Sequence, residues 1–188
     1  LFQTDYLQSN FTPDFGIGSL DNTKIAEVPL SSFVGTNWQY NKVKQNNTSV
    51  NLKHIFNPKF TLDASVGYQI FNRDYYAVER VQAAANGDWA RPLNGINSNE
   101  ENLSAIVNLT GKFSTGKVKH NILAGVDADE SYTKTFSYNN PKIYDTINIL
   151  DPNKFVQRTD IPSAEKISSL KTPSKSAGIY IQDLISLG

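Results

Sequence analysis

Residues 48–76 contain two runs of alternating apolar and polar side chains, joined by only three residues, Asn57, Pro58 and Lys59. In the second run one phase is apolar and the other is polar: Phe60, Leu62, Ala64, Val66, Tyr68 and Ile70 against Thr61, Asp63, Ser65, Gly67 and Gln69. A period of two is that of a strand with one apolar and one polar face. No helix separates the two sets in this way. The stretch therefore predicts an antiparallel β-hairpin.

The same alternation recurs along the chain and predicts about six strands, near residues 2–10, 47–56, 60–76, 101–113, 117–138 and 174–187. Two connections are tight turns, at residues 57–59 and 114–117, and three are long, at residues 11–46, 77–100 and 139–173. The second long connection contains two pairs that are typical of turns, Asn86-Gly87 and Asn94-Gly95. Long and short connections therefore alternate.

Composition excludes several classes of protein. The chain is 39% hydrophobic, its mean hydropathy is −0.41 and no apolar run approaches the length of a membrane-spanning helix. The 18 Lys and Arg residues balance the 18 Asp and Glu residues without a basic stripe, so we expect no nucleic-acid partner. Without Cys there are no disulfides or thiolate metal sites. The two His residues lie near the tight turns, and we expect neither catalysis nor a metal site.

The alternation of connection lengths favours one all-β architecture. Outer-membrane barrels have short periplasmic turns and long extracellular loops, whereas a soluble sandwich has loops of comparable length at both ends. Polar side chains on the second phase stay solvated in a wide lumen but are costly in a sandwich core: Asp63, Gln69, Asn108, Lys112, Asn121 and Asp127. We therefore predict antiparallel up-and-down strands that form part of the wall of a large transmembrane β-barrel.

The alternative is a soluble all-β binding module, such as an adhesin or a carbohydrate-binding sandwich, in which the apolar phases meet each other. Such a core needs large residues on every inner face. Small residues on the apolar phases, at Ala64, Ala105, Ala124, Ala128 and Ala177, mildly favour lipid-facing positions instead.

Several segments resemble the TonB-dependent siderophore receptors of Gram-negative outer membranes, in their ferrichrome-receptor-like branch. Residues 54–62 look like a strand, periplasmic turn and strand of that barrel, and residues 120–127 are similar to its "H-x-L-L-A-G-V-D" strand. Residues 178–183 match its "G-x-Y-x-Q-D" strand, and Asp151-Pro152 resembles an element of the long loop before that strand. The likeness extends from about Asn47 to Gly188.

The resemblance implies a function and a set of partners. It implies an outer-membrane receptor that takes up ferric siderophores with energy from TonB, with ferric iron present only as part of the ligand. Residues 1–188 would be a partial barrel domain, about a quarter of a wall of about twenty-two strands. The plug and the region that contacts TonB are not recognisable in the sequence, and the remaining partner is outer-membrane lipid.

In this family the ligand is bound by aromatic and polar side chains, and here the aromatics at the long-loop ends of the strands are the candidates. We predict ligand-binding residues at Trp38, Tyr40, Tyr75, Tyr76, Trp89 and Arg91. The arginine would pair with an anionic ligand, and the aromatic rings would line the pocket. Aromatics at this level also form an outer girdle or pack loops together.

Overall fold

The computed structural model of the chain describes residues 1–187. Its regular elements are strands, with the bounds β1 Phe2–Phe11, β2 Ser19–Leu20, β3 Lys24–Ile25, β4 Tyr40–Asn57, β5 Phe60–Val78, β6 Gln82–Ala83, β7 Asp88–Thr115, β8 Val118–Asn139, β9 Ile143–Asn148 and β10 Glu165–Leu187. Within this described part, no helix is long and apolar enough to cross a membrane.

The long strands form one sheet in the order β1-β4-β5-β7-β8-β10. β9 pairs with the N-terminal end of β7, at residues 88–92. Every pair along this path is antiparallel. Strands that follow one another among the long ones are therefore neighbours in the sheet. This up-and-down order confirms the predicted fold class, and β2, β3 and β6 form a separate small sheet.

Both tight turns form where the sequence predicts them. The Asn57 side-chain oxygen accepts hydrogen bonds from the backbone N–H groups of Lys59 at 2.8 Å and Phe60 at 3.1 Å. An asparagine that bonds the backbone two and three residues on closes a turn locally, which explains the short connection between β4 and β5. In the second turn Gly116 has a φ of 63°, a conformation that glycine adopts without steric cost.

Four strands run at least two residues further toward the long connections than the sequence predicts. β4 begins at residue 40 rather than 47, β5 ends at 78 rather than 76, β7 begins at 88 rather than 101, and β10 begins at 165 rather than 174. The prediction of a turn at Asn94-Gly95 is wrong, because both residues lie inside β7 opposite Ala77 and Tyr76. The backbone ladder with β5 holds Asn94 and Gly95 extended, and a second ladder with β8 joins from Asn97 onward. Asn86-Gly87 does turn the chain, and Gly87 has a φ of 86°.

Side chains on three neighbouring strands meet at a glycine in the middle one. Gly125 of β8 lies between Asn108 of β7 and Tyr180 of β10. The Tyr180 side chain crosses over Gly125, and its hydroxyl donates a hydrogen bond to the Asn108 side-chain oxygen. A Cβ at position 125 would lie 2.5 Å from that oxygen. An aromatic ring laid over a strand glycine fixes the register of neighbouring strands.

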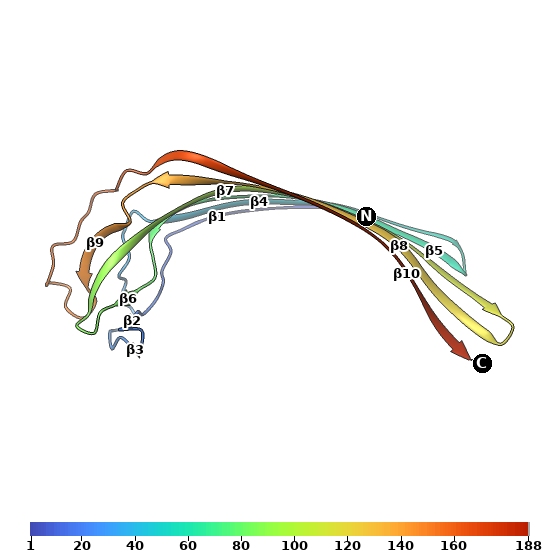
Figure 1. The fold of residues 1–188 in the computed structure, drawn as a ribbon, viewed down its shortest axis with the longest axis horizontal. Helices are drawn as coiled ribbons and strands as arrows, with labels where there is room; N and C mark the ends of the chain where they lie inside the picture. The colour runs from blue at the N-terminus through green and yellow to red at the C-terminus, as the bar shows by residue number, and fades with distance from the viewer. Residues whose placement is uncertain (188) are drawn as a thin grey trace.

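The two ends of the sheet differ in structure (Figure 1). The tight turns lie at one end, whereas β2, β3, β6 and β9 gather at the other end. Between them the sheet carries apolar side chains that no part of the described chain covers, such as Val66 and Val126, each 48% exposed. A strand sheet with an exposed apolar middle requires an apolar environment.

Candidate ligand-binding end

The loop end of the sheet contains the chain's hydrophobic core. We call residues 12–39, 79–96 and 140–164 the loop cluster. The buried core lies in this cluster and in the adjoining ends of the strands, with the members Ala26, Tyr76, Val78, Val81, Ala83, Trp89, Leu93, Tyr144, Ile147 and Ile149. The three long connections are therefore packed together rather than separate.

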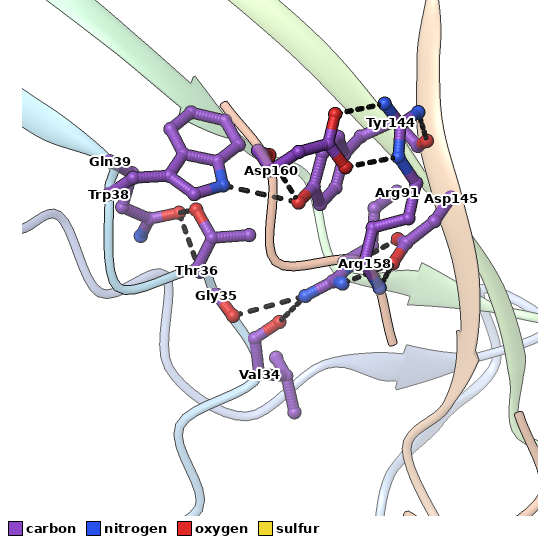
Figure 2. Close-up of polar contacts among 10 residues, drawn as sticks. All are labelled: Val34, Gly35, Thr36, Trp38, Gln39, Arg91, Tyr144, Asp145, Arg158 and Asp160. Atoms are coloured by element: carbon purple, nitrogen blue, oxygen red, sulfur yellow. Dashed lines mark hydrogen bonds and ion pairs between the residues drawn. The ribbon is translucent and has the colours of Figure 1, made fainter. Parts of the chain in front are cut away.

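Aromatic side chains join the first and third connections (Figure 2). The ring of Trp38 lies 5.4 Å from that of Tyr76 and 5.2 Å from that of Tyr144, the latter edge-on at 76°. The indole N–H of Trp38 donates to the Tyr144 hydroxyl at 3.3 Å, and that hydroxyl donates to the Asp160 carbonyl at 2.7 Å. Such tilted and edge-on pairs stabilise beyond the area they bury.

A buried ion pair lies at the centre of the loop cluster. Arg91 donates through Nε and Nη2 to the two carboxylate oxygens of Asp145, both at 2.5 Å, and the side chains are 1% and 7% exposed. Its Nη1 donates to the carbonyls of Val34 at 3.3 Å and Gly35 at 3.1 Å (Figure 2). The bidentate geometry makes a strong charge-assisted contact. One arginine on β7 therefore joins β9 to the first long connection.

A second ion pair packs against the ring of Tyr144. Arg158 pairs with Asp160 at 2.5 Å and donates to the Tyr144 carbonyl at 2.7 Å. The guanidinium groups of Arg158 and Arg91 lie 4.8 Å and 5.2 Å from the centre of the Tyr144 ring. Both arginines make cation–π contacts there.

A polar network ties the Asn86-Gly87 turn to the chain after β9. Lys154 contacts both carboxylate oxygens of Asp88, at 2.7 and 2.9 Å, and Asn148 donates to Asp88 at 2.7 Å. The hydrogen bond from Lys154, followed by that from Asn148, lowers the pKa of Asp88 below its usual value. The Asn148 oxygen in turn accepts from the backbone N–H groups of Leu150 and Asp151.

The structure brings all six predicted ligand-binding residues to the loop end. Trp89, Tyr75, Tyr76 and Arg91 are buried there, and Trp38 is partly buried. The partly buried Tyr40 donates to Asp74 at 3.4 Å, and burial together with this carboxylate raises its pKa to about 12. Burial and a hydrogen bond to Glu79 also raise the pKa of Tyr75. The contacts described hold the loops together, and ligand contact by these residues stays a prediction.

Sequence reasoning missed the partners of Arg91. Asp145 shares a strand phase with Ile143, Ile147 and Ile149, and a lone carboxylate on an apolar phase is a sign of a buried ion pair. The pairing itself joins residues 54 positions apart, so no local pattern identifies Arg91 as the partner.

The loop cluster also contains a cavity of about 370 Å³ between residues 27–34 and residues 147–157. Most of its lining is apolar, from the side chains of Val28, Pro29, Phe33, Val34, Ile147, Ile149, Leu150 and Pro152. Glu27 is the one charged residue in the lining, which also includes Ser32, Asn148 and Gln157. The cavity is open enough to admit a small apolar group.

An up-and-down antiparallel sheet with an exposed apolar middle, tight turns at one end and packed loops at the other is the wall of a transmembrane β-barrel. No family model matches the chain. Among curated proteins, the probable TonB-dependent siderophore receptor PiuA of Acinetobacter baumannii is 27% identical over 147 residues, which cover 71% of this chain and 19% of that protein. The chain thus spans about a fifth of the relative's length.

Solved structures of siderophore receptors have the same fold. The closed form of the ferric-catecholate import receptor Fiu of E. coli K12 superposes with a TM-score of 0.83 at 18% identity, over 100% of this chain and 29% of that one. PiuA of A. baumannii gives 0.79 at 20% identity, over 100% and 30%. The pyoverdine receptor FpvA of Pseudomonas aeruginosa gives 0.73 at 17% identity, over 96% and 27%. The resemblance to TonB-dependent siderophore receptors and the barrel-wall fold are confirmed.

Proposed function

We propose that this chain forms part of the wall of an outer-membrane receptor that takes up ferric siderophores with energy transmitted by TonB. The observation that carries the proposal is the sheet itself, whose apolar side chains are uncovered between the tight turns and the loop cluster. In an outer membrane this face contacts lipid, the turns face the periplasm and the loop cluster faces the medium. The likeness to PiuA supplies the class of ligand.

The soluble sandwich is the less favoured alternative. A sandwich buries the apolar phase of each strand against a second sheet. Here large apolar side chains in the middle of several strands stay exposed, for example Leu103 at 43% and Ile179 at 85%. The described chain folds no second layer over them.

In this orientation the two ends of the sheet have different roles. The tight turns only connect strands, whereas the loop cluster is the part that meets molecules in the medium. It needs no catalytic group, because transport of an intact ferric complex makes and breaks no bond in the protein. Its packed hydrophobic core holds the loop surfaces in fixed positions for ligand binding.

Transport assays on the full receptor that contains this chain test the proposal. In a siderophore-deficient strain, the receptor should support uptake of radioactive iron supplied as a ferric siderophore, and deletion of TonB should abolish that uptake. Trp38→Ala should weaken ligand binding several-fold, since loss of a packed aromatic costs on the order of 0.5 to 1.5 kcal/mol beyond its area burial. Lys59→Ala, in a tight turn, serves as the control and should change neither assembly nor binding. Uptake that persists without TonB, or binding that depends on Lys59 and not on Trp38, would contradict the proposal.

A further inference from the structure

Two ion pairs lie on the apolar phase of the last two long strands. Glu130 of β8 pairs with Lys175 of β10 at 2.8 Å, and His120 of β8 contacts Asp183 of β10 at 2.7 Å. His120 and Glu130 are ten residues apart along β8. At a rise of about 3.3 Å per residue and a tilt of about 40°, this is roughly 25 Å along the barrel axis, the height of the apolar band of an outer-membrane barrel. The two pairs therefore mark the two membrane interfaces on this face.

The pair of His120 and Asp183 is the one near the tight turns (Figure 1). β8 begins only two residues before His120, directly after the second tight turn. A charged side chain on the lipid face is costly at the middle of the bilayer, but the cost falls toward zero at the interface. In the orientation proposed above, the pair therefore lies at the level of the lipid headgroups on the periplasmic side. Both residues belong to segments that carry the family resemblance, 120–127 and 178–183, and the proposed function uses neither of them.

Each member of the pair has a polar atom left for a ligand. Nδ1 of His120 contacts Oδ2 of Asp183, so the ring directs its other nitrogen, Nε2, away from this carboxylate. Within residues 1–187, no group is hydrogen-bonded to this Nε2 or to Oδ1 of Asp183. The two side chains are 18% and 29% exposed, and the imidazole stacks on the ring of Phe113 at 4.9 Å. A carboxylate oxygen and an imidazole nitrogen are therefore both accessible at the headgroup level.

An apolar groove of about 570 Å³ adjoins the pair on the side of the membrane interior. Its floor is Ala124, which lies between Leu109 of β7 and Ile181 of β10 in one row of the sheet. The small side chain leaves a trough between two larger ones, and all three strands belong to this chain. Ile181 is two residues from Asp183 on the same phase, so the groove begins directly beside the pair. The lining residues on this phase are Val107, Leu109, Ala124, Val126, Ile179 and Ile181.

A glycerophospholipid with a primary ammonium in its headgroup matches both parts of this surface. Its ammonium can donate to Oδ1 of Asp183, and its phosphate can accept from the N–H that a protonated His120 presents at Nε2. Hydrogen bonds between charged groups of this kind are stronger than those between neutral groups. A quaternary ammonium has no N–H to donate, and an anionic headgroup without an amine is repelled by the Asp183 carboxylate. An acyl chain in the groove gains from contact with its apolar lining.

Resting on the membrane orientation proposed above, we propose that His120 and Asp183 bind the headgroup of a phospholipid with a primary ammonium in the periplasmic leaflet, and that one acyl chain of this lipid lies in the groove over Ala124. This lipid site is at the opposite end of the sheet from the loop cluster. It gives the turn end of the chain a binding role that is independent of the transported ligand.

Competition between lipids for the full receptor tests the inference. Delipidated receptor in detergent is mixed with equal amounts of phosphatidylethanolamine, phosphatidylcholine and phosphatidylglycerol with the same acyl chains, and bound lipids are identified by native mass spectrometry. We expect about fivefold more retained phosphatidylethanolamine than either other lipid, the effect of one charge pair at an exposed site. Equal retention, or a preference for another lipid, in a receptor that supports siderophore uptake would overturn the inference and leave the proposed function standing. The expected preference in a receptor without TonB-dependent uptake would support the lipid site and overturn the proposed function.

A matched pair of variants tests the headgroup contact. Asp183→Asn keeps the shape of the side chain but removes its charge, and it should reduce retention of phosphatidylethanolamine to about the level of phosphatidylcholine. Asp127→Asn is the control, because Asp127 lies on the polar phase of β8, opposite Gly178, and it should keep the preference. If Asp183→Asn lowers the thermal stability of the receptor but keeps the preference, the ion pair only links two strands and the inference is overturned.

A second pair of variants tests the groove. Ala124→Phe fills the trough and should reduce retention of all three lipids about fivefold without changing their ranking. Ala64→Phe makes the same change on the same face of the sheet, but on β5, which β7 separates from β8, and should have no such effect. Equal effects of the two variants would overturn the placement of the acyl chain over Ala124.

Discussion

Replacing Arg91 by Met should loosen the loop cluster without preventing assembly of the barrel. Methionine has an unbranched apolar side chain like the stem of arginine, but it lacks the guanidinium that pairs with Asp145. It leaves a 7%-exposed carboxylate without its cation and the carbonyls of Val34 and Gly35 without a donor. Breaking a buried pair by removing one partner costs about 3–5 kcal/mol.

Hydrogen exchange on the full receptor measures this loss locally. The backbone amides of β9, which is held to β7 beside the ion pair, should exchange roughly a hundred-fold to several thousand-fold faster in Arg91→Met, because each 1.4 kcal/mol of opening free energy is about tenfold in rate. Amides in the middle of β5 and β8 should be unchanged, since each is paired on both sides.

Arg80→Met is the matched control, because Arg80 is 77% exposed and its carboxylate partner lies 3.9 Å away. Its effect should be below about 1 kcal/mol. The double variant Arg91→Met with Asp145→Leu should recover much of the lost protection, because no charge then stays buried without a partner. If the β9 amides exchange at the same rate in Arg91→Met as in Arg80→Met, the Arg91–Asp145 ion pair is not the link between the loops.

Three further predictions concern the two faces of the sheet, Gly125 and Tyr40. Val66→Arg should cost roughly 2–4 kcal/mol more than Ser65→Arg in assembly in the outer membrane, since only the first places a charge in lipid. Equal amounts of folded receptor for the two variants would show that the assignment of the two faces is wrong. Gly125→Ala should destabilise the sheet by about 1–3 kcal/mol in a denaturant titration, because its Cβ would overlap side chains on both neighbouring strands, whereas Gly67→Ala meets only a serine oxygen at 3.3 Å and should cost less. Because the pKa of Tyr40 rises from 10.0 to about 12 on folding, its contribution to stability is complete below pH 10.0 and is lost as the pH rises toward 12. Hydrogen-exchange protection of the loop cluster should therefore fall more steeply across this range in the wild type than in Tyr40→Phe, and identical profiles would exclude the contribution.

The sheet could be predicted because its determinants are local. Alternation over ten or more residues fixes the two faces of each strand, and Asn57 and Gly116 carry the turn chemistry in their own residue types. The extended ends of the strands could not be predicted. Residues 94–100 are mostly polar and contain an Asn-Gly pair, and they stay extended because β5 supplies ladder partners along the whole stretch and β8 supplies them from Asn97 onward.

The candidate site could be predicted only in outline. Aromatic residues at the strand ends indicate that the candidate ligand-binding residues are at the loop end, and all six predicted residues lie there. The contacts that shape it join three connections far apart in sequence, such as Trp38 with Tyr144 and Arg91 with Asp145. The cavity between residues 27–34 and 147–157 exists only after those connections have packed, so no pattern within either one reveals it.

Thiol labelling of intact cells tests most directly whether this chain crosses the outer membrane with its loop cluster outside. The chain has no Cys, so a single introduced cysteine gives an unambiguous signal from this part of the receptor. A membrane-impermeant maleimide should label Val156→Cys, in the third long connection, on intact cells. It should label Lys59→Cys, in a tight turn, only after the outer membrane has been permeabilised. Labelling of Lys59→Cys on intact cells while Val156→Cys stays protected would contradict the orientation on which the proposed function depends.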